Sequence, residues 1–138
     1  MNMLKQLALT AAFWGLSLAA SAADVSALQQ RWAQIHYELP LKQQAKAYAL
    51  LADEARQLTD ANPDSAAAHI WQGIILSSWA GAEGGLGALG KVKEARAELE
   101  QALALEPDAL QGSAYTSLGA LYYQVPGWPI GFGDEAKA

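Results

Sequence analysis

The stretch NPDSAAAHIWQGIIL, residues 62–76, begins with a Pro-Asp turn and continues into a helix-forming segment with Gly73 near its middle. A second stretch, EPDALQGSAYTSLGALYY, residues 106–123, repeats this order, with Gly119 in the place of Gly73. Internal similarity of this kind governs the architecture, because it means that one supersecondary unit recurs along the chain. The two stretches therefore predict a fold made of repeated helical units.

Helix-forming residues dominate the chain on both sides of these stretches. Between residues 91 and 105, apolar side chains recur at steps of three and four and make one stripe, which consists of Val92, Ala95, Leu99, Ala102 and Leu103. Pro107 ends that helix. The same pattern predicts helices over residues 25–37, 42–61, 65–79, 91–105 and 113–125, and the first turn of a sixth from Asp134. Strand signals are almost missing, so we expect an all-α fold of antiparallel helix-turn-helix units.

Two blocks of sequence resemble the tetratricopeptide repeat, whose first helix has the pattern W-x₂-L-G-x₂-Y. Tyr115-x₂-Leu118-Gly119-x₂-Tyr122 is similar to this pattern, with Tyr in place of Trp, and His69-x₂-Gln72-Gly73-x₂-Leu76 matches it at its glycine and at Leu76. Ala95-x₃-Leu99-x₂-Ala102, followed by Pro107, resembles the second half of the preceding repeat. The resemblance implies a solenoid of helical hairpins, in which a small Gly lets two helices approach closely and a large neighbour fills the adjoining space.

The connections inside the hairpins are expected to be long. Pro63 and Pro107 are 44 residues apart, about ten more than one repeat of this family, and we place the extra residues in SSWAGAEGGLGALG, residues 77–90. A second Gly/Pro-rich connection, QVPGWPIGFGDEA, spans residues 124–136. Long connections of this kind resemble exported bacterial tetratricopeptide-like proteins, including the T component associated with tripartite periplasmic transporters, and the eukaryotic regulators of microtubule dynamics. No site residue is carried over from either group.

The N-terminus has the pattern of a secretory signal peptide. One Lys in residues 1–6 precedes an apolar run over residues 7–20, and Ala20-Ser21-Ala22 is a small-x-small cleavage site. The apolar run is shorter than the roughly 20 residues that span a bilayer. We therefore predict cleavage after Ala22, a helical repeat domain over residues 23–138, and a periplasmic or secreted protein with no stable membrane anchor. The chain has no cysteine, which excludes disulfides and a lipid-modified N-terminal cysteine.

The balance of charge argues against nucleic acid as a partner. The chain has 9 Lys and Arg against 14 Asp and Glu, a net charge of −5, and loss of Lys5 with the signal peptide makes the domain still more acidic. Phosphate contacts need a basic stripe, whereas the cationic residues here are scattered. An anionic membrane surface is disfavoured for the same reason.

The stretch GGLGALGK, residues 84–91, matches the spacing of a phosphate-binding loop and of a dinucleotide fingerprint. Both motifs need a preceding strand, and the phosphate-binding loop also needs Ser or Thr after its Lys; here Val92 follows Lys91. We interpret Gly84–Gly90 as a flexible connection, in which glycine adopts positive φ without penalty. An anion held at the start of the next helix by Lys91 and Lys93 remains an alternative.

No metal, cofactor or catalytic site is expected. His36 and His69 are the two histidines, they lie on different predicted helices, and no cysteine can join them as a ligand. We expect His36 to stabilise a helix C-terminus, and His69 to pack or to point to solvent. Glu94 and Glu98 lie four residues apart, but charges of both signs alternate around them as on a solvated helix face. The sequence therefore favours a protein that is not an enzyme.

The expected function is the binding of a partner. Stacked hairpins form a concave surface lined by their first helices, and helical spacing places candidate binding residues there, namely Ile70, Ile74, Ser77, Thr116, Ala120 and Tyr123. The leading interpretation is a periplasmic module that binds a peptide or protein. The alternative is a small-molecule-binding accessory of a periplasmic transport system, with a cavity between the Gly84–Gly90 and Val125–Gly133 connections.

The apolar connection over residues 125–133 has two interpretations of its own. Trp128 and Phe132 either plug the core of the domain or form a wall of a pocket for the partner. Residues 134–138 resemble the first turn of the second helix of a repeat, and a helix that short is marginal alone. The sequence is then either a fragment of a longer repeat protein or leaves residues 115–132 poorly covered, which predicts self-association over that apolar end.

Overall fold

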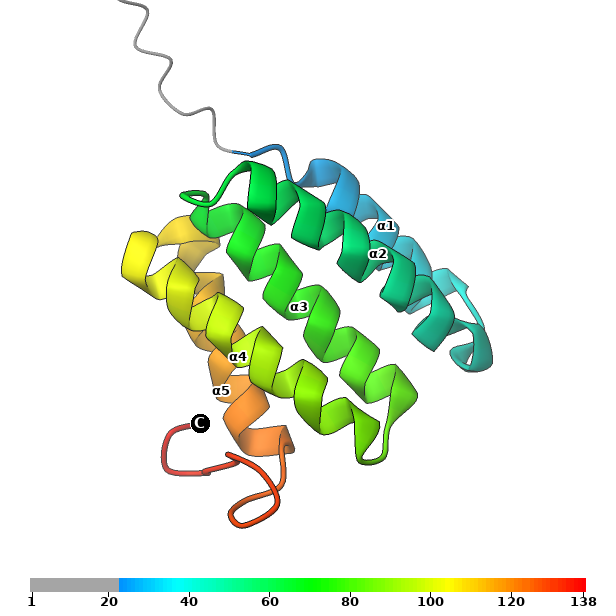
Figure 1. The fold of residues 1–138 in the computed structure, drawn as a ribbon, viewed down its shortest axis with the longest axis vertical. Helices are drawn as coiled ribbons and strands as arrows, with labels where there is room; N and C mark the ends of the chain where they lie inside the picture. Colours follow the sequence, from blue (N-terminus) through cyan, green and yellow to red (C-terminus); the bar gives the residue numbers. More distant parts are fainter. Residues whose placement is uncertain (1–22) are drawn as a thin grey trace, which may run out of the picture.

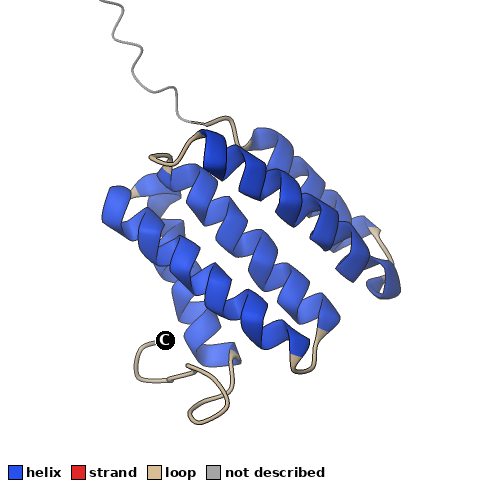
Figure 2. Ribbon diagram, viewed as in Figure 1, coloured by secondary structure: helices blue, strands red, loops and turns tan. Residues whose placement is uncertain are grey.

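The computed structural model describes residues 23–138, and the predicted signal peptide, residues 1–22, lies outside the described residues. The described chain consists of helices and turns, with one isolated bridge between Gly127 and Gly133 (Figure 2). Its elements are α1 (Ser26–Glu38), α2 (Leu41–Ala61), α3 (Ala66–Glu83), α4 (Gly87–Leu105), the short 3-10 helix η1 (Ala109–Gly112) and α5 (Ser113–Gln124). The predicted all-α fold class is confirmed.

The helices form antiparallel hairpins that stack side by side (Figure 1). α1 pairs with α2 and α3 with α4, while α3 lies between α2 and α4, and α5 packs against both α4 and α3. Because α1 also contacts α3, the first helices α1, α3 and α5 are neighbours on one side of the stack. On the other side, Arg56 of α2 donates a hydrogen bond to Glu94 of α4 at 3.1 Å. This is the arrangement expected of helical repeats.

Gly73 sets the close approach of α3 and α4. A Cβ at this position would lie 2.7 Å from Cγ of Leu99 and 3.3 Å from the carbonyl oxygen of Ala95. No side chain fits such a space unless Leu99 of α4 moves. The predicted role of this glycine in helix packing is therefore confirmed.

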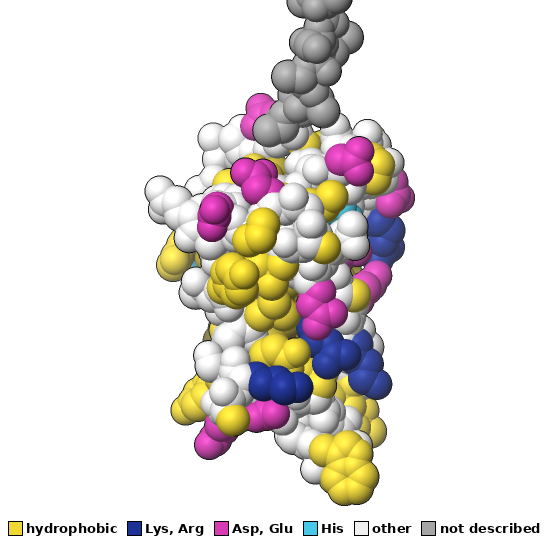
Figure 3. Space-filling model, turned by 90° about the vertical axis from the view of Figure 1, so that its left-hand side faces the viewer, with side chains coloured by type: hydrophobic (Ala, Val, Ile, Leu, Met, Phe, Trp, Pro, Cys, Tyr) yellow, Lys and Arg dark blue, Asp and Glu magenta, His cyan; other side chains and the backbone are white. Residues whose placement is uncertain are grey.

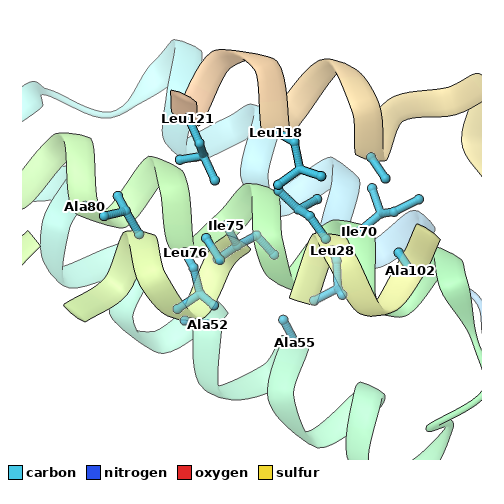
Figure 4. Packing of buried hydrophobic residues seen from close by; sticks show 14 of the residues in the cluster. Leu28, Ala52, Ala55, Ile70, Ile75, Leu76, Ala80, Ala102, Leu118 and Leu121 are labelled. Carbon is cyan, nitrogen blue, oxygen red and sulfur yellow. The ribbon is translucent and has the colours of Figure 1, made fainter. Parts of the chain in front are cut away.

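The core runs through the middle of the stack and centres on α3, which is apolar on nearly all sides. Figure 4 shows side chains from several helices that meet around it, including Leu28 of α1, Ala52 of α2, Leu76 of α3 and Leu118 of α5. The largest fully buried side chains are Tyr48, Leu51, Ile70, Ile75, Leu76 and Leu99. Burial of such side chains contributes about 1.5–3 kcal/mol each, so the core rather than local helix propensity stabilises the hairpins.

The connection between α3 and α4 is shorter than the sequence predicts. The additional residues extend both helices, because α3 continues to Glu83 and α4 already begins at Gly87, not near Lys91. The turn itself comprises residues 84–86, where Gly84 and Gly85 both have φ of +66°. Only these two glycines of the stretch need the left-handed region; the others are accommodated in helices that are rich in Ala and Leu.

The passage from α4 to α5 is a strained turn within η1. Leu110 and Gln111 have φ of 49° and 58°, and Gly112 follows with 76°. Non-glycine residues adopt this region rarely, at a cost of about 1–2 kcal/mol each. Two more residues separate Pro107 from Gly119 than separate Pro63 from Gly73, and the left-handed turn accommodates them without displacing α5 from the stack.

The segment after α5 folds back onto the stack. Phe132 lies edge-on to Tyr122 at 5.6 Å, and the guanidinium of Arg96 lies 4.3 Å from the Phe132 ring centre. The amide of Asp134 donates to the carbonyl of Tyr122 at 2.8 Å, and the amide of Ala138 donates to the carbonyl of Asp134 at 3.1 Å. Residues 134–138 thus form a single turn where the sequence predicts the beginning of a sixth helix.

Within residues 23–138, no helix combines the length and the hydropathy needed to cross a bilayer.

Candidate functional site

A shallow groove separates α3 from α5 on the side of the stack formed by the first helices. Its volume is about 130 Å³. It is lined by Ile74, Ser77 and Ser78 from α3 and by Ser117, Ala120, Leu121 and Gln124 from α5. We call this feature the α3–α5 groove.

A second pocket continues the groove toward the α3–α4 turn. Its volume is about 210 Å³, and it shares Ser77, Leu121 and Gln124 with the groove. The remaining lining is apolar or small, and consists of Ala80, Gly81, Gly85, Ala88, Leu89, Val92, Val125 and Pro126. We call it the turn pocket. The two hollows are therefore adjacent and share part of their lining.

The lining of the two hollows is uncharged. Neither lining contains Asp, Glu, Lys, Arg or His. Hydroxyl groups and one amide provide hydrogen bonds, and the apolar walls provide contact area. Such a surface suits an uncharged segment of a ligand, because an ion brought here would lose water without gaining a partner.

Three of the seven predicted partner-binding residues line the site. Ile74 and Ser77 on α3 face Ala120 on α5, as helical spacing predicted. Ile70, by contrast, is fully buried, so it cannot contact a partner at the surface. Ile70 belongs to the hydrophobic core between the helices.

The other three predicted residues are exposed but lie outside the lining. Thr116 and Tyr123 lie on the solvent side of α5. Trp128 is 90% exposed and forms no wall of either pocket. Phe132 behaves differently, since it packs against the core. Of the two aromatic residues in the connection over residues 125–133, Phe132 therefore covers the core as one interpretation predicted. Trp128 neither covers the core nor lines a pocket.

Sequence reasoning missed three residues of α5 that face α3, namely Ser117, Leu121 and Gln124. They recur at steps of four and three, so the helical period was available in the sequence. The sequence does not specify which face of α5 is turned toward α3. The predicted face of α5 was the neighbouring one, about a quarter-turn away.

Lys91 connects the two helices on either side of the glycine-rich turn. The ammonium of Lys91 forms an ion pair with Glu83, donates to the carbonyl of Gly87 at 3.2 Å, and lies 4.4 Å from the ring centre of Trp79. These contacts fasten the end of α3 to the beginning of α4. Because the charge of Lys91 is already paired, the alternative of an anion site at this turn loses its main cation.

His69 is buried, so of the two expectations packing is confirmed and exposure to solvent is wrong. Its Nε2 lies 2.7 Å from the carbonyl oxygen of Pro63, and its Nδ1 lies 2.6 Å from Oε2 of Glu98. The two ring nitrogens thus face two different partners, one on the turn before α3 and one on α4. Glu98 was expected on a solvated face, and this expectation is wrong.

His36 belongs to a polar network that joins the first three helices. Its ring stacks on Trp32 at 4.8 Å, and its Nδ1 lies 3.2 Å from the hydroxyl of Tyr48. The indole N–H of Trp32 donates to the hydroxyl of Ser78 at 2.8 Å. Burial raises the pKa of the Tyr48 phenol above its usual value, and a hydrogen bond with Ser78 opposes this shift. These contacts hold α1, α2 and α3 together.

In the part of the chain from residue 23 onward, no group of three or more His, Asp or Glu side chains is placed to hold a metal ion.

The chain matches no family model, no curated protein and no solved structure.

Proposed function

We propose that the protein is an exported, tetratricopeptide-like helical repeat that binds an uncharged segment of a peptide or protein in the α3–α5 groove and the turn pocket, without catalysis. The observation that carries the proposal is the pair of adjacent hollows along α3 and α5, whose linings have no ionisable side chain. Helical repeats commonly use the side formed by their first helices to bind extended or helical segments. The signal-peptide pattern of residues 1–22 supports a periplasmic or secreted location.

The sizes of the two hollows favour side chains of a longer ligand. Each is smaller than the roughly 300–1,000 Å³ of typical small-molecule sites, at about 130 and 210 Å³. Two adjoining small hollows fit successive anchors of a peptide better than they fit one compact ligand.

The test uses peptides selected from a randomised library against the full chain, with affinities measured by calorimetry. Gln124 lines both hollows, so Gln124→Asp introduces a charge into the site. Position 124 is exposed in the free protein, so an uncharged ligand that covers it would bury the new charge without a partner. We therefore expect at least about tenfold weaker binding, which corresponds to about 1.4 kcal/mol. Tyr115→Asp is the matched control, since Tyr115 lies nine residues away on α5, on the opposite side of the helix. Undiminished affinity of Gln124→Asp for every selected peptide would reject the groove as the binding site.

The location is tested separately. Cell fractionation and the mass of the purified protein should give a periplasmic or secreted product that begins at Ala23. A cytoplasmic product with an intact N-terminus would contradict export, and it would leave the groove unaffected.

One observation favours the second candidate, a small-molecule-binding accessory of a periplasmic transport system. The turn pocket lies between the α3–α4 turn at Gly85, the first turn of α4 at Ala88, and the start of the last connection at Pro126. Native mass spectrometry of the protein purified from its compartment would detect a retained metabolite. Under this candidate, Ala88→Trp fills the pocket and removes the bound mass.

A further inference from the structure

The connections inside the helical hairpins all lie along one edge of the stack. α1 and α2 are joined by residues 39–40, α3 and α4 by residues 84–86, and α5 continues into residues 125–133. Successive helices are antiparallel, so these three connections share one edge, while residues 62–65 and 106–112 share the opposite edge (Figure 1). We call the first the hairpin edge and the second the repeat edge.

The hairpin edge carries the most exposed large apolar side chains in residues 23–138. The four highest exposed fractions among such residues are 90% for Trp128, 82% for Leu41 and Leu86, and 76% for Tyr37. Single exposed apolar residues are ordinary on a protein surface, but here each of the three connections carries or adjoins at least one. Figure 3 shows a hydrophobic group that protrudes at the end of the molecule opposite the grey trace. The hairpin edge therefore presents a row of projecting apolar side chains.

The two edges also differ in charge. At the start of α1 and within two positions of the repeat-edge connections, every charged residue is acidic, namely Asp24, Asp60, Asp64, Glu106 and Asp108. Both signs occur near the hairpin edge, where the charged residues are Glu38, Lys42, Glu83, Lys91, Asp134, Glu135 and Lys137. Lys91 and Glu83 form an ion pair there. The apolar edge is thus close to neutral, and the acidic edge lies at the other end of the helices.

We propose that the hairpin edge docks reversibly on the interface of a zwitterionic lipid bilayer. The side chains of Tyr37, Leu41, Leu86 and Trp128 insert among the headgroups, and the acidic repeat edge is turned away from the lipid. Trp and Tyr favour this depth, because an apolar ring and a polar N–H or O–H suit the boundary between hydrocarbon and water. The hairpin edge has no excess of Lys or Arg that would hold it on an anionic surface.

The arrangement of the projecting side chains favours lipid over a protein as the occupant. They stand on separate connections, and neighbouring helix axes in a packed stack are about 8–10 Å apart. A protein interface depends on a compact cluster of closely packed residues. A fluid bilayer interface accepts separate side chains, each of which inserts by itself. This surface is additional to the peptide site, because none of the four side chains lines the α3–α5 groove or the turn pocket.

The test measures the binding of the protein, purified from the compartment in which it accumulates, to phosphatidylcholine vesicles. Residues 7–20 are apolar and bind lipid wherever they are retained, so the readout must be local to the edge. Because the chain has no cysteine, Leu86→Cys and Asp64→Cys each accept one environment-sensitive fluorophore, the first at the hairpin edge and the second at the repeat edge. We expect vesicles to shift the emission of the label at residue 86 to shorter wavelength and to leave the label at residue 64 unchanged.

Variants of the unlabelled protein test the side chains themselves in a vesicle flotation assay. Leu41→Asp, Leu86→Asp and Trp128→Asp should each lower the partition coefficient about tenfold, because each replaces an inserted apolar group by a charge. Leu41 is the first residue of α2 and Leu86 is the N-cap of α4, places where Asp favours the helix. Leu50→Asp is the matched control, since Leu50 is 59% exposed but lies in the middle of α2. Its partition should equal that of the unsubstituted protein.

The proposal is overturned if the label at residue 86 does not respond to vesicles or if the label at residue 64 responds equally. It is also overturned if Leu50→Asp weakens binding as much as the hairpin-edge variants do. Vesicles that contain phosphatidylglycerol should bind no better than phosphatidylcholine alone, and tighter binding to them would contradict the zwitterionic assignment. The label response requires no aspartate variant, so it decides the matter even where Trp128→Asp unfolds.

Discussion

Glu94 and Glu98 look alike in the sequence, yet their environments on α4 differ. Glu94 pairs with Arg56, and the side chains of both are 45% exposed. Glu98 pairs with His69, and their side chains are 22% and 10% exposed. Water screens the first pair and is largely kept away from the second, so only the second is expected to contribute much to stability.

Glu98→Ala should lower the free energy of unfolding by about 2 kcal/mol, because it leaves the buried His69 without one of its partners. Glu94→Ala, on the same helix, should lower it by less than about 1 kcal/mol. Urea denaturation of the two variants checks both values. Equal losses would show that the His69 contact is not special.

Gln72 is the one buried side chain among residues 23–138 with a polar atom, Oε1, that has no hydrogen-bond partner. The equivalent position of the next repeat, Leu118, is apolar and also buried. Gln72→Leu should therefore raise the free energy of unfolding by about 1 kcal/mol, since it removes an unsatisfied acceptor from the core.

Thermal denaturation measures this change, with Gln101→Leu on the exposed side of α4 as the control. The control should change stability by less than about 0.5 kcal/mol. A loss of stability in Gln72→Leu would contradict the assignment of Oε1 as an unsatisfied acceptor.

At the scale of the helices, two glycines have opposite roles. Gly73 faces Leu99 at a distance that excludes a Cβ, whereas nothing lies within 4 Å of the Cβ position of Gly90. Gly73→Ala should destabilise the protein by about 1–3 kcal/mol through overpacking, although alanine is the better helix former. Gly90→Ala should stabilise it by up to about 1 kcal/mol. Denaturant unfolding distinguishes the two, and a gain of stability in both would show that α3 and α4 are not in tight contact.

The helices themselves could be predicted from the sequence, since their apolar stripes have the helical period. The short α3–α4 turn could not be predicted, because Gly81, Gly87 and Gly90 were interpreted as part of a long, flexible connection. A glycine costs a helix only about 1 kcal/mol. The burial of Ala80 on the extension of α3, together with the contacts of Lys91, offsets that cost.

The candidate site could be predicted only in part. Helical spacing identified Ile74, Ser77 and Ala120. The complete burial of Ile70 and the face that α5 turns toward α3 depend instead on how neighbouring helices contact one another. That contact is long-range, and no local pattern of α5 specifies it. The position of Trp128 outside the core likewise follows from how the last connection folds back at Phe132.

For the molecule as a whole, stability should decrease from the centre of the stack toward the α5 end. α3 is packed against α1, α2, α4 and α5, whereas α5 is packed against α4, α3 and η1. In stacked repeats each unit is stabilised mainly by its neighbours, and poorly covered units open more readily. Hydrogen exchange should therefore be slowest in α3 and faster in α5 and residues 125–138. Uniform exchange rates along the chain would indicate a single cooperative unit.

The hydrogen bond between Trp32 and Ser78 couples the α3–α5 groove to the fluorescence of a tryptophan. Ser78 lines the α3–α5 groove and accepts from the indole N–H of Trp32 at 2.8 Å. Indole emission changes wavelength and intensity with the polarity around the ring and with the state of its N–H group. A ligand that contacts Ser78 should therefore alter the fluorescence of a tryptophan on α1, one repeat away, without any added dye. Trp32→Phe removes this response and leaves the binding surface in place, so the occupancy of the groove can be followed by emitted light.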